Sequence, residues 1–256
     1  MNRGLASIIS NSEVIPRVHL IWLESPQIAS EAKPGQFVMV RCGEETLLRR
    51  PLSIHQLADA TKIAFLFTVV GKGTYWLSQC EAGDNIDLLG PLGNSYSIHP
   101  ASHNLLLVAG GIGIAPLRFL AQEALYQGYS VTLLLGAPTA NQLYSKHFLP
   151  PEAELIIATE DGTAGKKGMI TALLPDFIDW ADQIFACGPT SMYRTIANQS
   201  QHWLKPVQIS LEVRMGCGRG VCYGCTVKTK NGLNQVCKDG PVFDLEDILW
   251  DELSYI

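Results

Sequence analysis

The stretch RMGCGRGVCYGC, residues 214–225, holds three cysteines and four glycines. A fourth thiol follows at Cys237, so the spacing is C-x4-C-x2-C-x11-C. Thiols this close together are typical of metal ligands, either in a zinc site or in an iron–sulfur cluster.

The spacing favours the iron–sulfur cluster. Structural zinc sites usually use two paired knuckles, whereas C-x4-C-x2-C followed by a distant cysteine is the pattern of plant-type [2Fe–2S] proteins. The glycines allow the loop to turn its amide N–H groups toward the sulfurs. We therefore predict a [2Fe–2S] cluster with the ligands Cys217, Cys222, Cys225 and Cys237, and keep a zinc-stabilised binding module without a redox role as an alternative.

Composition limits the class of protein. The 256 residues are 47% hydrophobic and 17% charged, with a formal net charge of −5, which is typical of a globular chain and argues against nucleic acid as a partner. No apolar run is long enough to span a bilayer, and the N-terminus turns polar before a signal-peptide core develops. An odd total of seven cysteines suits a cluster in a reducing compartment better than a disulfide framework. We expect a cytoplasmic protein with no membrane partner.

A glycine-rich turn, AGGIGIAP, lies between an apolar strand and an amphipathic helix. Gly110, Gly111 and Gly113 allow the backbone to approach a ligand, and the helix N-terminus favours a phosphate. This turn predicts nucleotide binding, and a plain strand–helix turn is the alternative. The next strand is followed by neither an acidic residue for the ribose nor an arginine for a 2′-phosphate, which favours NAD over NADP.

Three further segments are candidates for cofactor contacts. In FACGPTSMY, Cys187 and Gly188 follow a later strand, where open sheets bind ligands, although a core cysteine is equally consistent. In LLRRPLSI, Arg50 offers a fork suited to phosphate and Ser53 can hydrogen-bond a ring edge. Gly73 and Thr74 in VVGKGTYWLS suit a pyrophosphate. No side chain is predicted to be catalytic, because the six histidines are dispersed and no nucleophile has a base nearby.

The pattern of apolar segments predicts an α+β multidomain fold. Short apolar pieces separated by turn residues predict an antiparallel β-barrel over residues 1–100. Strands alternating with helical segments predict a doubly wound α/β sheet over residues 101–211. Residues 212–256 form the cysteine module, whose acidic end, FDLEDILWDEL, is predicted to be a short helix. In that end Phe243, Ile248 and Trp250 either dock a partner or cover the cluster.

In this order, RRPLS, GKGT, GGIGIAP, CGP and the cysteine tail resemble the electron-transfer subunits of type B, NAD-dependent dihydroorotate dehydrogenases, within the ferredoxin–NADP reductase superfamily. The resemblance covers essentially the whole chain. It implies FAD on the barrel, NAD on the sheet, and all four cysteines as cluster ligands. The residues that it assigns to FAD are Arg50, Pro51, Leu52, Ser53, Leu66, Phe67, Thr68, Gly73 and Thr74, and it places Cys187 near the nicotinamide.

The resemblance also implies a partner and a reaction. An FMN-containing catalytic subunit would oxidise dihydroorotate, and electrons would pass through this chain to NAD+ in the biosynthesis of the pyrimidine nucleotide UMP, with two copies of each subunit in a heterotetramer. The alternative with the same motifs is the FAD and [2Fe–2S] subunit of a hydrogenase, a sulfite reductase or a ferredoxin-dependent NAD(P) oxidoreductase.

Overall fold

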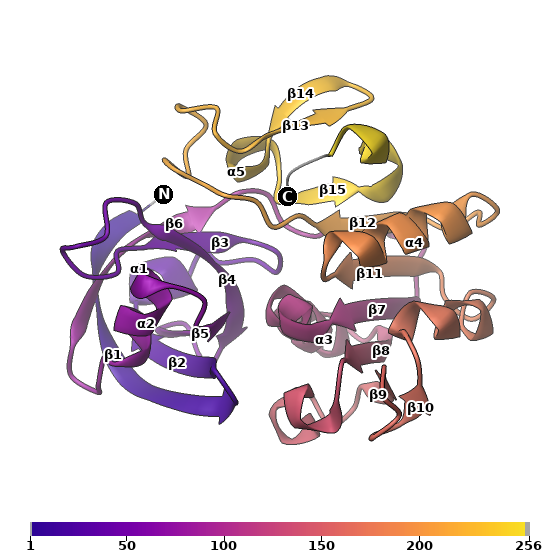
Figure 1. Ribbon diagram of the computed structural model, residues 1–256, viewed down its shortest axis with the longest axis horizontal. Coiled ribbons are helices and arrows are strands. Elements are labelled where there is room, and N and C mark those ends of the chain that lie inside the picture. The colour runs from indigo at the N-terminus through magenta and orange to yellow at the C-terminus, as the bar shows by residue number, and fades with distance from the viewer. Residues whose placement is uncertain (1, 254–256) are drawn as a thin grey trace.

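The computed structural model describes residues 2–253 and contains a barrel, a larger sheet with its helices, and a small C-terminal module that lies over both (Figure 1). The first two units lie side by side, and the module packs across the top of them in this view. Within the described residues, no helix is both long enough and apolar enough to cross a membrane.

The predicted antiparallel barrel is confirmed. Its strand order is β1-β2-β5-β4-β3-β6, and it is closed. In the strand β6, buried positions alternate strictly with more exposed ones, as expected for a barrel wall with one face toward the core. The six strands are β1 (Asn2–Ile15), β2 (Val18–Glu24), β3 (Phe37–Val40), β4 (Arg50–Leu57), β5 (Lys62–Thr68) and β6 (Asn85–Leu92), and the helices α1 (Pro26–Ala29) and α2 (Lys72–Ser78) lie between them in the chain.

The second unit is a seven-stranded sheet with the order β10-β9-β8-β7-β11-β12-β15. All neighbouring pairs are parallel except β12 with β15, which confirms a doubly wound arrangement. Nearly every residue of β7 and β8 is buried, as expected for strands covered on both faces. The strands are β7 (Asn104–Gly110), β8 (Ser130–Ala137), β9 (Glu154–Thr159), β10 (Lys166–Lys167), β11 (Gln183–Cys187), β12 (Val207–Ser210) and β15 (Val242–Asp244).

Two layers cover this sheet. The helix α3 (Ile114–Tyr126) packs on the face that carries Leu105 and Leu107, together with barrel residues. The helix α4 (Thr190–Ser200) and the 3-10 segment η4 (Ile170–Asp176) pack on the face that carries Leu106. Chain order turns back between β7 and β11, so the loops after these two strands flank the point where open sheets bind ligands.

The C-terminal module contains the hairpin β13–β14 (Thr226–Thr229 and Gly232–Gln235) and the short helix α5 (Val236–Asp239). The helix predicted for FDLEDILWDEL is wrong: the segment begins with the strand β15 and continues as the 3-10 turns η5 (Leu245–Asp247) and η6 (Trp250–Glu252). The strand forms because Phe243 lies opposite Ile209 on the open edge of β12. A sheet edge supplies backbone partners that an isolated short helix lacks.

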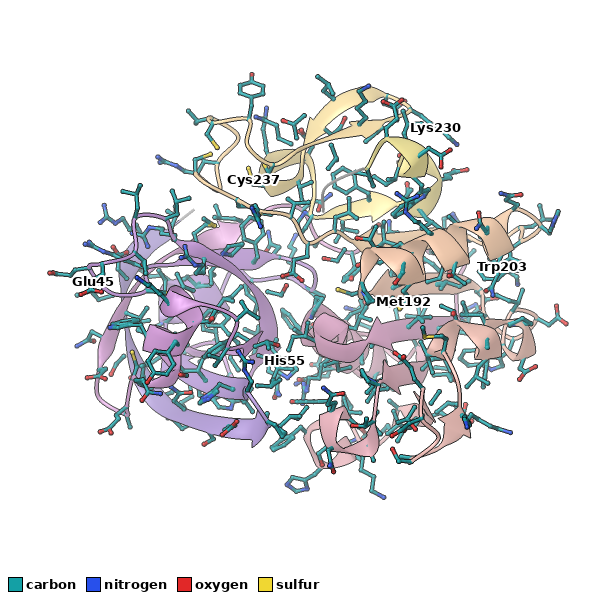
Figure 2. The ribbon with its side chains drawn as sticks, viewed as in Figure 1. Glu45, His55, Met192, Trp203, Lys230 and Cys237 are labelled. Atoms are coloured by element: carbon teal, nitrogen blue, oxygen red, sulfur yellow. The ribbon has the colours of Figure 1, made fainter. Side chains whose placement is uncertain are left out.

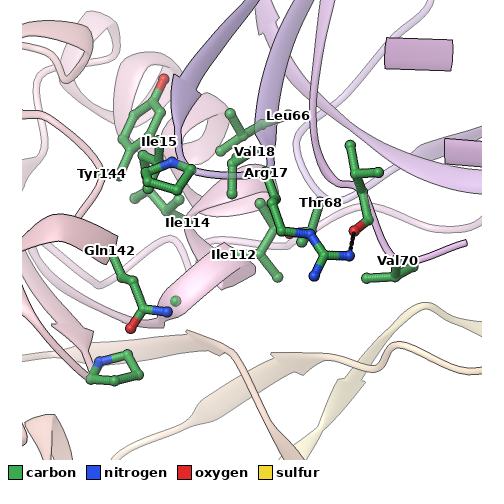
Figure 3. Close-up of a pocket in the computed structure, with 14 residues that line it drawn as sticks. Ile15, Arg17, Val18, Leu66, Thr68, Val70, Ile112, Ile114, Gln142 and Tyr144 are labelled. Carbon is green, nitrogen blue, oxygen red and sulfur yellow. Dashed lines mark hydrogen bonds between the residues drawn. The ribbon is translucent and has the colours of Figure 1, made fainter. Parts of the chain in front are cut away.

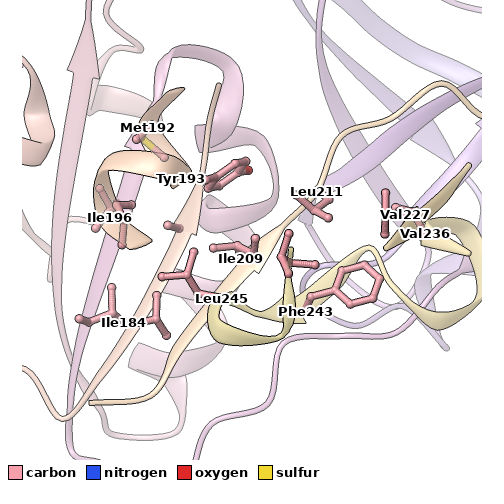
Figure 4. Close-up of a cluster of buried hydrophobic side chains, with 14 of the residues drawn as sticks. Ile184, Met192, Tyr193, Ile196, Ile209, Leu211, Val227, Val236, Phe243 and Leu245 are labelled. Carbon is pink, nitrogen blue, oxygen red and sulfur yellow. The ribbon is translucent and has the colours of Figure 1, made fainter. Parts of the chain in front are cut away.

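The last described segment, residues 243–253, packs on the module and the sheet. Phe243 and Ile248 are buried, and the Trp250 ring lies 5.8 Å from that of Tyr193 on α4. Phe243 and Ile248 are therefore packed inside this chain and have little surface to offer a partner, and that they cover the cluster stays a prediction. Figure 4 shows Leu245 beside Ile209 of the sheet unit, and Val236 further away, beside Val227 of the module; all of these side chains belong to one buried cluster.

The three units share hydrophobic cores. One buried cluster joins Met39 and Leu92 of the barrel to Val236 of the module and Ile209 of the sheet. A second joins Leu66 of the barrel to residues of β7 and α3. Because apolar area is buried across each boundary, the units are held in one relative arrangement.

His55 forms a polar bridge inside the boundary between barrel and sheet. Its ring is fully buried; Nδ1 lies 2.8 Å from the carbonyl oxygen of Ala115, and Nε2 lies 2.8 Å from the hydroxyl of Tyr144 (Figure 2 labels His55). A carbonyl oxygen only accepts, so Nδ1 must carry the proton and Nε2 accepts from Tyr144. Burial, more than any other effect, lowers the pKa of His55 to about 3, although the hydrogen bond to Ala115 opposes that shift.

From the buried, neutral His55 we predict that the folded protein loses stability in mild acid. Unfolding frees His55 to bind a proton near its ordinary pKa of about 6.5, so the folded state loses stability as the pH falls below that value toward 3. The loss assigned to His55 at pH 5 is about 2 kcal/mol relative to pH 7. Denaturant unfolding at both pH values should show that His55→Gln removes about this much of the pH dependence. The exposed His202→Gln is the control, and an equal pH dependence in all three proteins would contradict the assignment.

Candidate functional site

The turns after β7 and β11 press against each other. A Cβ added to Gly113 would lie 1.9 Å from the carbonyl oxygen of Cys187, and one added to Gly110 would lie 2.9 Å from Pro189. Any side chain at Gly113 would therefore separate the two turns. The predicted nucleotide residues Gly110, Gly113, Cys187 and Gly188 are thus brought together where the strand order reverses.

Cys187 is part of the interior at this point. Its side chain is buried, and burial above all raises the thiol pKa to about 12, so the sulfur stays protonated. The adjacent Tyr193 hydroxyl accepts from the Gly188 N–H at 3.0 Å and donates to the Ser210 carbonyl at 2.6 Å. These bonds fix the shape of the Cys187–Gly188 turn.

On the barrel, Arg50 lies over the first turn of α2. A Cβ added to Gly73 would come within 2.9 Å of Arg50 Nε, so this glycine provides the space that the guanidinium occupies. Thr74 closes the turn, because its Oγ1 accepts from the N–H groups of Val70 and Gly71 at 2.9 and 3.2 Å. The structure thus brings Arg50 to Gly73 and Thr74, which lie more than 20 positions further along the chain. A guanidinium over an open backbone fits a pyrophosphate.

The other predicted flavin residues lie on two strands. Pro51, Leu52 and Ser53 run along β4, opposite Met39, Val38 and Phe37 of β3. On β5, Leu66 and Thr68 point toward the sheet unit, whereas the side chain of Phe67 lies in the barrel interior, with its ring stacked 5.6 Å from that of His19. Only the backbone of Phe67 is therefore open to a ligand on the sheet side.

A pocket of about 350 Å³ opens between the barrel and the sheet (Figure 3). The barrel contributes the β1–β2 turn and the end of β5, and the sheet contributes the loops after β7 and β8. Three of the predicted site residues line it: Leu66, Thr68 and Gly111. The residues that sequence reasoning missed are Ile15, Pro16, Arg17, Val18, Val69, Val70, Ile112, Ile114, Pro138, Gln142 and Tyr144.

Most of these missed residues carry no local signal. Ile112 and Ile114 lie inside the glycine-rich turn and could have been included with it. The residues 15–18 belong to the turn between the first two strands and reach the pocket only because the barrel packs against the sheet. Tyr144 is held there by its hydrogen bond to His55.

The four cysteines of the C-terminal module lie in two pairs. Cys225 Sγ accepts from the N–H of Cys237 at 3.4 Å, and Cys222 lies close enough to Cys217 to help lower the pKa of that thiol. Among the described residues, no three His, Cys, Asp or Glu side chains gather around a single point for one metal ion. Two pairs of thiols suit a centre with two metal ions better than the four-coordinate geometry of one zinc ion.

Backbone N–H groups are directed at these sulfurs. Cys217 Sγ accepts from Arg219 and Val221, each at 3.3 Å, and Cys237 Sγ accepts from Gly220 at 3.1 Å. Burial is the largest influence on Cys217 and raises its pKa, but the N–H groups of Arg219, Cys222 and Val221 outweigh it and bring the pKa to about 6. Donors aimed at sulfur stabilise thiolate, which is the form that binds metal.

Two further observations concern the cysteine loop: an unpaired donor beside it, which fits a cluster, and its contact with the barrel. The buried Nε2 of Gln235 has no hydrogen-bond partner, and the Oε1 of the same amide lies 3.0 Å from the Cβ position of Gly220 in the cysteine loop. An acceptor among the thiols would satisfy this donor. A Cβ on Gly218 would lie 2.5 Å from Met39, so the loop is seated directly on the barrel. Cys237 in Figure 2 marks the position of the site in the module.

Comparison with known families identifies the same segment. Residues 212–249 match the family described as the iron-sulfur cluster binding domain of dihydroorotate dehydrogenase B. The chain is 40% identical to the electron transfer subunit of dihydroorotate dehydrogenase B (NAD(+)) from Desulforamulus reducens, with 96% of this chain and 98% of that one covered. The corresponding subunit from Bacillus pumilus is 34% identical, over 97% and 98% of the two chains.

Solved structures with the same fold support the architecture. A chain of the NADH-dependent reduced ferredoxin-NADP oxidoreductase has a TM-score of 0.88 and 34% identity, and the match covers 98% of this chain and 91% of that one. The ferredoxin reductase of carbazole 1,9a-dioxygenase has a TM-score of 0.72 at 17% identity, over 81% and 68% of the chains, which shows a shared fold.

The paired thiols predict the effect of Cys222→Ser. The variant should lose most of its iron and inorganic sulfide, because a hydroxyl is a poor ligand for this centre. The sheet should stay folded, since Cys222 is exposed and lies outside the shared cores. Iron and sulfide analysis with far-ultraviolet circular dichroism tests both points. Cys80→Ser, in the barrel, is the control and should keep its iron; full iron content in Cys222→Ser would contradict the ligand assignment.

The contact between Arg50 and Gly73 predicts weaker flavin retention in Arg50→Ala. Charge-assisted hydrogen bonds contribute about 1.5–3 kcal/mol each, so the affinity for FAD should fall by about tenfold or more. Flavin absorbance after extensive dialysis measures this. The exposed Arg41→Ala serves as control. Equal flavin occupancy in Arg50→Ala, Arg41→Ala and the unchanged protein would show that Arg50 does not bind the flavin.

Proposed function

The chain belongs to the family of electron-transfer subunits of dihydroorotate dehydrogenase B, and from this we propose that it passes electrons from a catalytic partner subunit, which oxidises dihydroorotate, to NAD+. It is the electron-relaying part of an oxidoreductase of pyrimidine biosynthesis. One observation carries this proposal. The cysteine loop, with its two thiol pairs, packs directly against the barrel, and the barrel faces a nucleotide-type sheet.

The chain's own residues hold and separate the cofactors. Cys217 and Cys222 would hold one iron, and Cys225 and Cys237 the other, with the N–H groups of the loop stabilising the charge on sulfur. Arg50 and Gly73 would hold the flavin pyrophosphate. When bound, the cluster supplies one-electron transfer, and FAD supplies exchange between single electrons and a hydride.

The pocket would receive the pyridine dinucleotide, including its nicotinamide end. Its lining is largely apolar, with Leu66, Ile112 and Ile114 among the residues that face it, so water is kept from the position where a hydride is exchanged. Because Gly218 contacts Met39, the cysteine loop rests directly on the barrel. This contact would fix the distance between the cluster and the flavin.

Several finer assignments belong to the same proposal. The partner would contain FMN, two copies of each subunit would form a heterotetramer, and the complex would be cytoplasmic. Residues 1–100, 101–211 and 212–256 would be the FAD, NAD and cluster units. Val221 and Tyr223, each 71% exposed beside the paired thiols, give the cysteine loop an apolar rim that suits docking of the catalytic subunit.

A second candidate function has its own support. The likeness to the NADH-dependent reduced ferredoxin-NADP oxidoreductase, at 34% identity over 98% of this chain, favours a subunit that exchanges electrons with ferredoxin. The two functions share the same cofactor sites and differ in the chain that contacts the cysteine loop.

Reconstitution with each electron donor separates them. The chain should be co-expressed with the dihydroorotate dehydrogenase catalytic chain of its own genome, and NAD+ reduction followed at 340 nm. We expect reduction that depends on dihydroorotate, that requires both subunits, and that disappears in Cys222→Ser. Reduction driven by reduced ferredoxin but not by dihydroorotate would establish the second candidate. A complex with full cofactors that reduces NAD+ from neither donor would contradict both.

A further inference from the structure

The pocket between barrel and sheet contains one charge. Among its described lining residues, Arg17 alone carries a formal charge, and the others are apolar or neutral. One nitrogen of its guanidinium, Nη2, donates to the Val69 carbonyl at 2.6 Å. Within the described residues, no carboxylate forms an ion pair with Arg17. Arg17 is exposed at the edge of this pocket, and the Glu13 carboxylate accepts from its backbone N–H rather than from its guanidinium. The remaining guanidinium N–H donors are therefore open to a ligand at the pocket edge.

Arg17 also has an uncommon backbone conformation. Pro16 and Arg17 connect β1 to β2, and Arg17 has φ of +66°. A turn with proline followed by a positive φ favours glycine or asparagine at the second of these positions, because a Cβ there is crowded. The backbone of this turn would be less strained with glycine at position 17, yet the residue there has a long cationic side chain. Strained positions of this kind are concentrated at binding sites.

The position of Arg17 suggests its ligand. In Figure 3 the guanidinium lies near Ile112 and Val70, and Gln142 lies across the pocket from it. Pro138 and Gln142, which both follow β8, line this pocket. Loops at the carboxyl ends of β7 and β8 are where an open sheet binds a nucleotide. An anion bound by these loops would lie within the same cavity as the arginine.

We propose that Arg17 binds a phosphate group of the pyridine dinucleotide, so that the barrel, rather than the sheet, supplies the cation for this ligand. This inference rests on the proposed nucleotide site and adds a residue to it. The planar guanidinium can donate two parallel hydrogen bonds to phosphate oxygens while Nη2 stays anchored to Val69. The phosphate is either in the pyrophosphate, which NAD and NADP share, or at the 2′ position of NADP.

A purely structural role for Arg17 predicts no effect on the nucleotide. If the bond to Val69 is the only role of the arginine, Arg17→Gly can alter the melting temperature but leaves the affinity for dinucleotide as it is. The variant loses this bond and relieves the crowded backbone under either role, so the melting temperature serves to show that the variant is folded. A loss of nucleotide affinity in a folded variant is expected only under the proposal.

The test uses the full chain loaded with FAD, with Arg17→Gly and the charge-conserving Arg17→Lys. Binding of NAD+ and of NADP+ is measured by titration calorimetry at fixed ionic strength, along with FAD content and melting temperature. We expect Arg17→Gly to bind dinucleotide about tenfold more weakly, as for loss of one hydrogen bond to a charged group. FAD content should be unchanged, and Arg17→Lys should recover most of the affinity.

Each outcome is decisive. Equal weakening for NAD+ and NADP+ places the arginine at the pyrophosphate, and weakening for NADP+ alone places it at the 2′-phosphate. Unchanged affinity for both, or loss of FAD, overturns the assignment while leaving the nucleotide site intact. If the unchanged protein binds neither dinucleotide, the proposed function fails instead, so the two failures are distinguishable.

Discussion

The fixed contact between the cysteine loop and the barrel is the constraint on which the other features depend. Electron transfer over a protein interior falls steeply with distance, so a relay needs its centres held at one separation. Gly218 packs against Met39 without an intervening side chain, and Met39 belongs to the same buried cluster as Val236 of the module and Ile209 of the sheet. Moving the loop would therefore open a core, which costs several kcal/mol for a single large side chain.

The strand β15 extends this constraint to the end of the chain. It pairs with β12 and so makes the cysteine module part of the nucleotide sheet, although its sequence lies beyond the cysteines. The backbone carbonyl of Gly240 also accepts from Asn94, and the Asn94 side chain bonds to Val242, in the segment that links barrel to sheet. One short segment thus contacts all three units, and the module is not an appendage on a flexible linker.

The features that could be predicted well from the sequence depend on residues close together in the chain. The cysteine spacing, the glycine-rich turn and the alternating apolar segments each depend on neighbours a few residues away, and the barrel, the parallel sheet and the paired thiols agree with them. What it missed depends on long-range packing. The acidic end became a strand because an open sheet edge was available to it, and the barrel core determines that the Phe67 side chain points inward. The assignment of Phe67 to the flavin stays a prediction, through its backbone. His55 and Tyr144 are 89 positions apart, so their bridge has no local signature.

The absence of an arginine after β8 favoured NAD over NADP in the sequence, on the assumption that a sheet supplies its own phosphate ligand. The structure offers a cation from the other unit as well, because Pro138 and Gln142, which follow β8, line the same pocket as Arg17 of the barrel. A residue about 120 positions away can provide the charge that the local segment lacks. The phosphate contact proposed for Arg17 would therefore depend on the whole cavity, which the barrel and the sheet line together, and not on the segment after β8 alone.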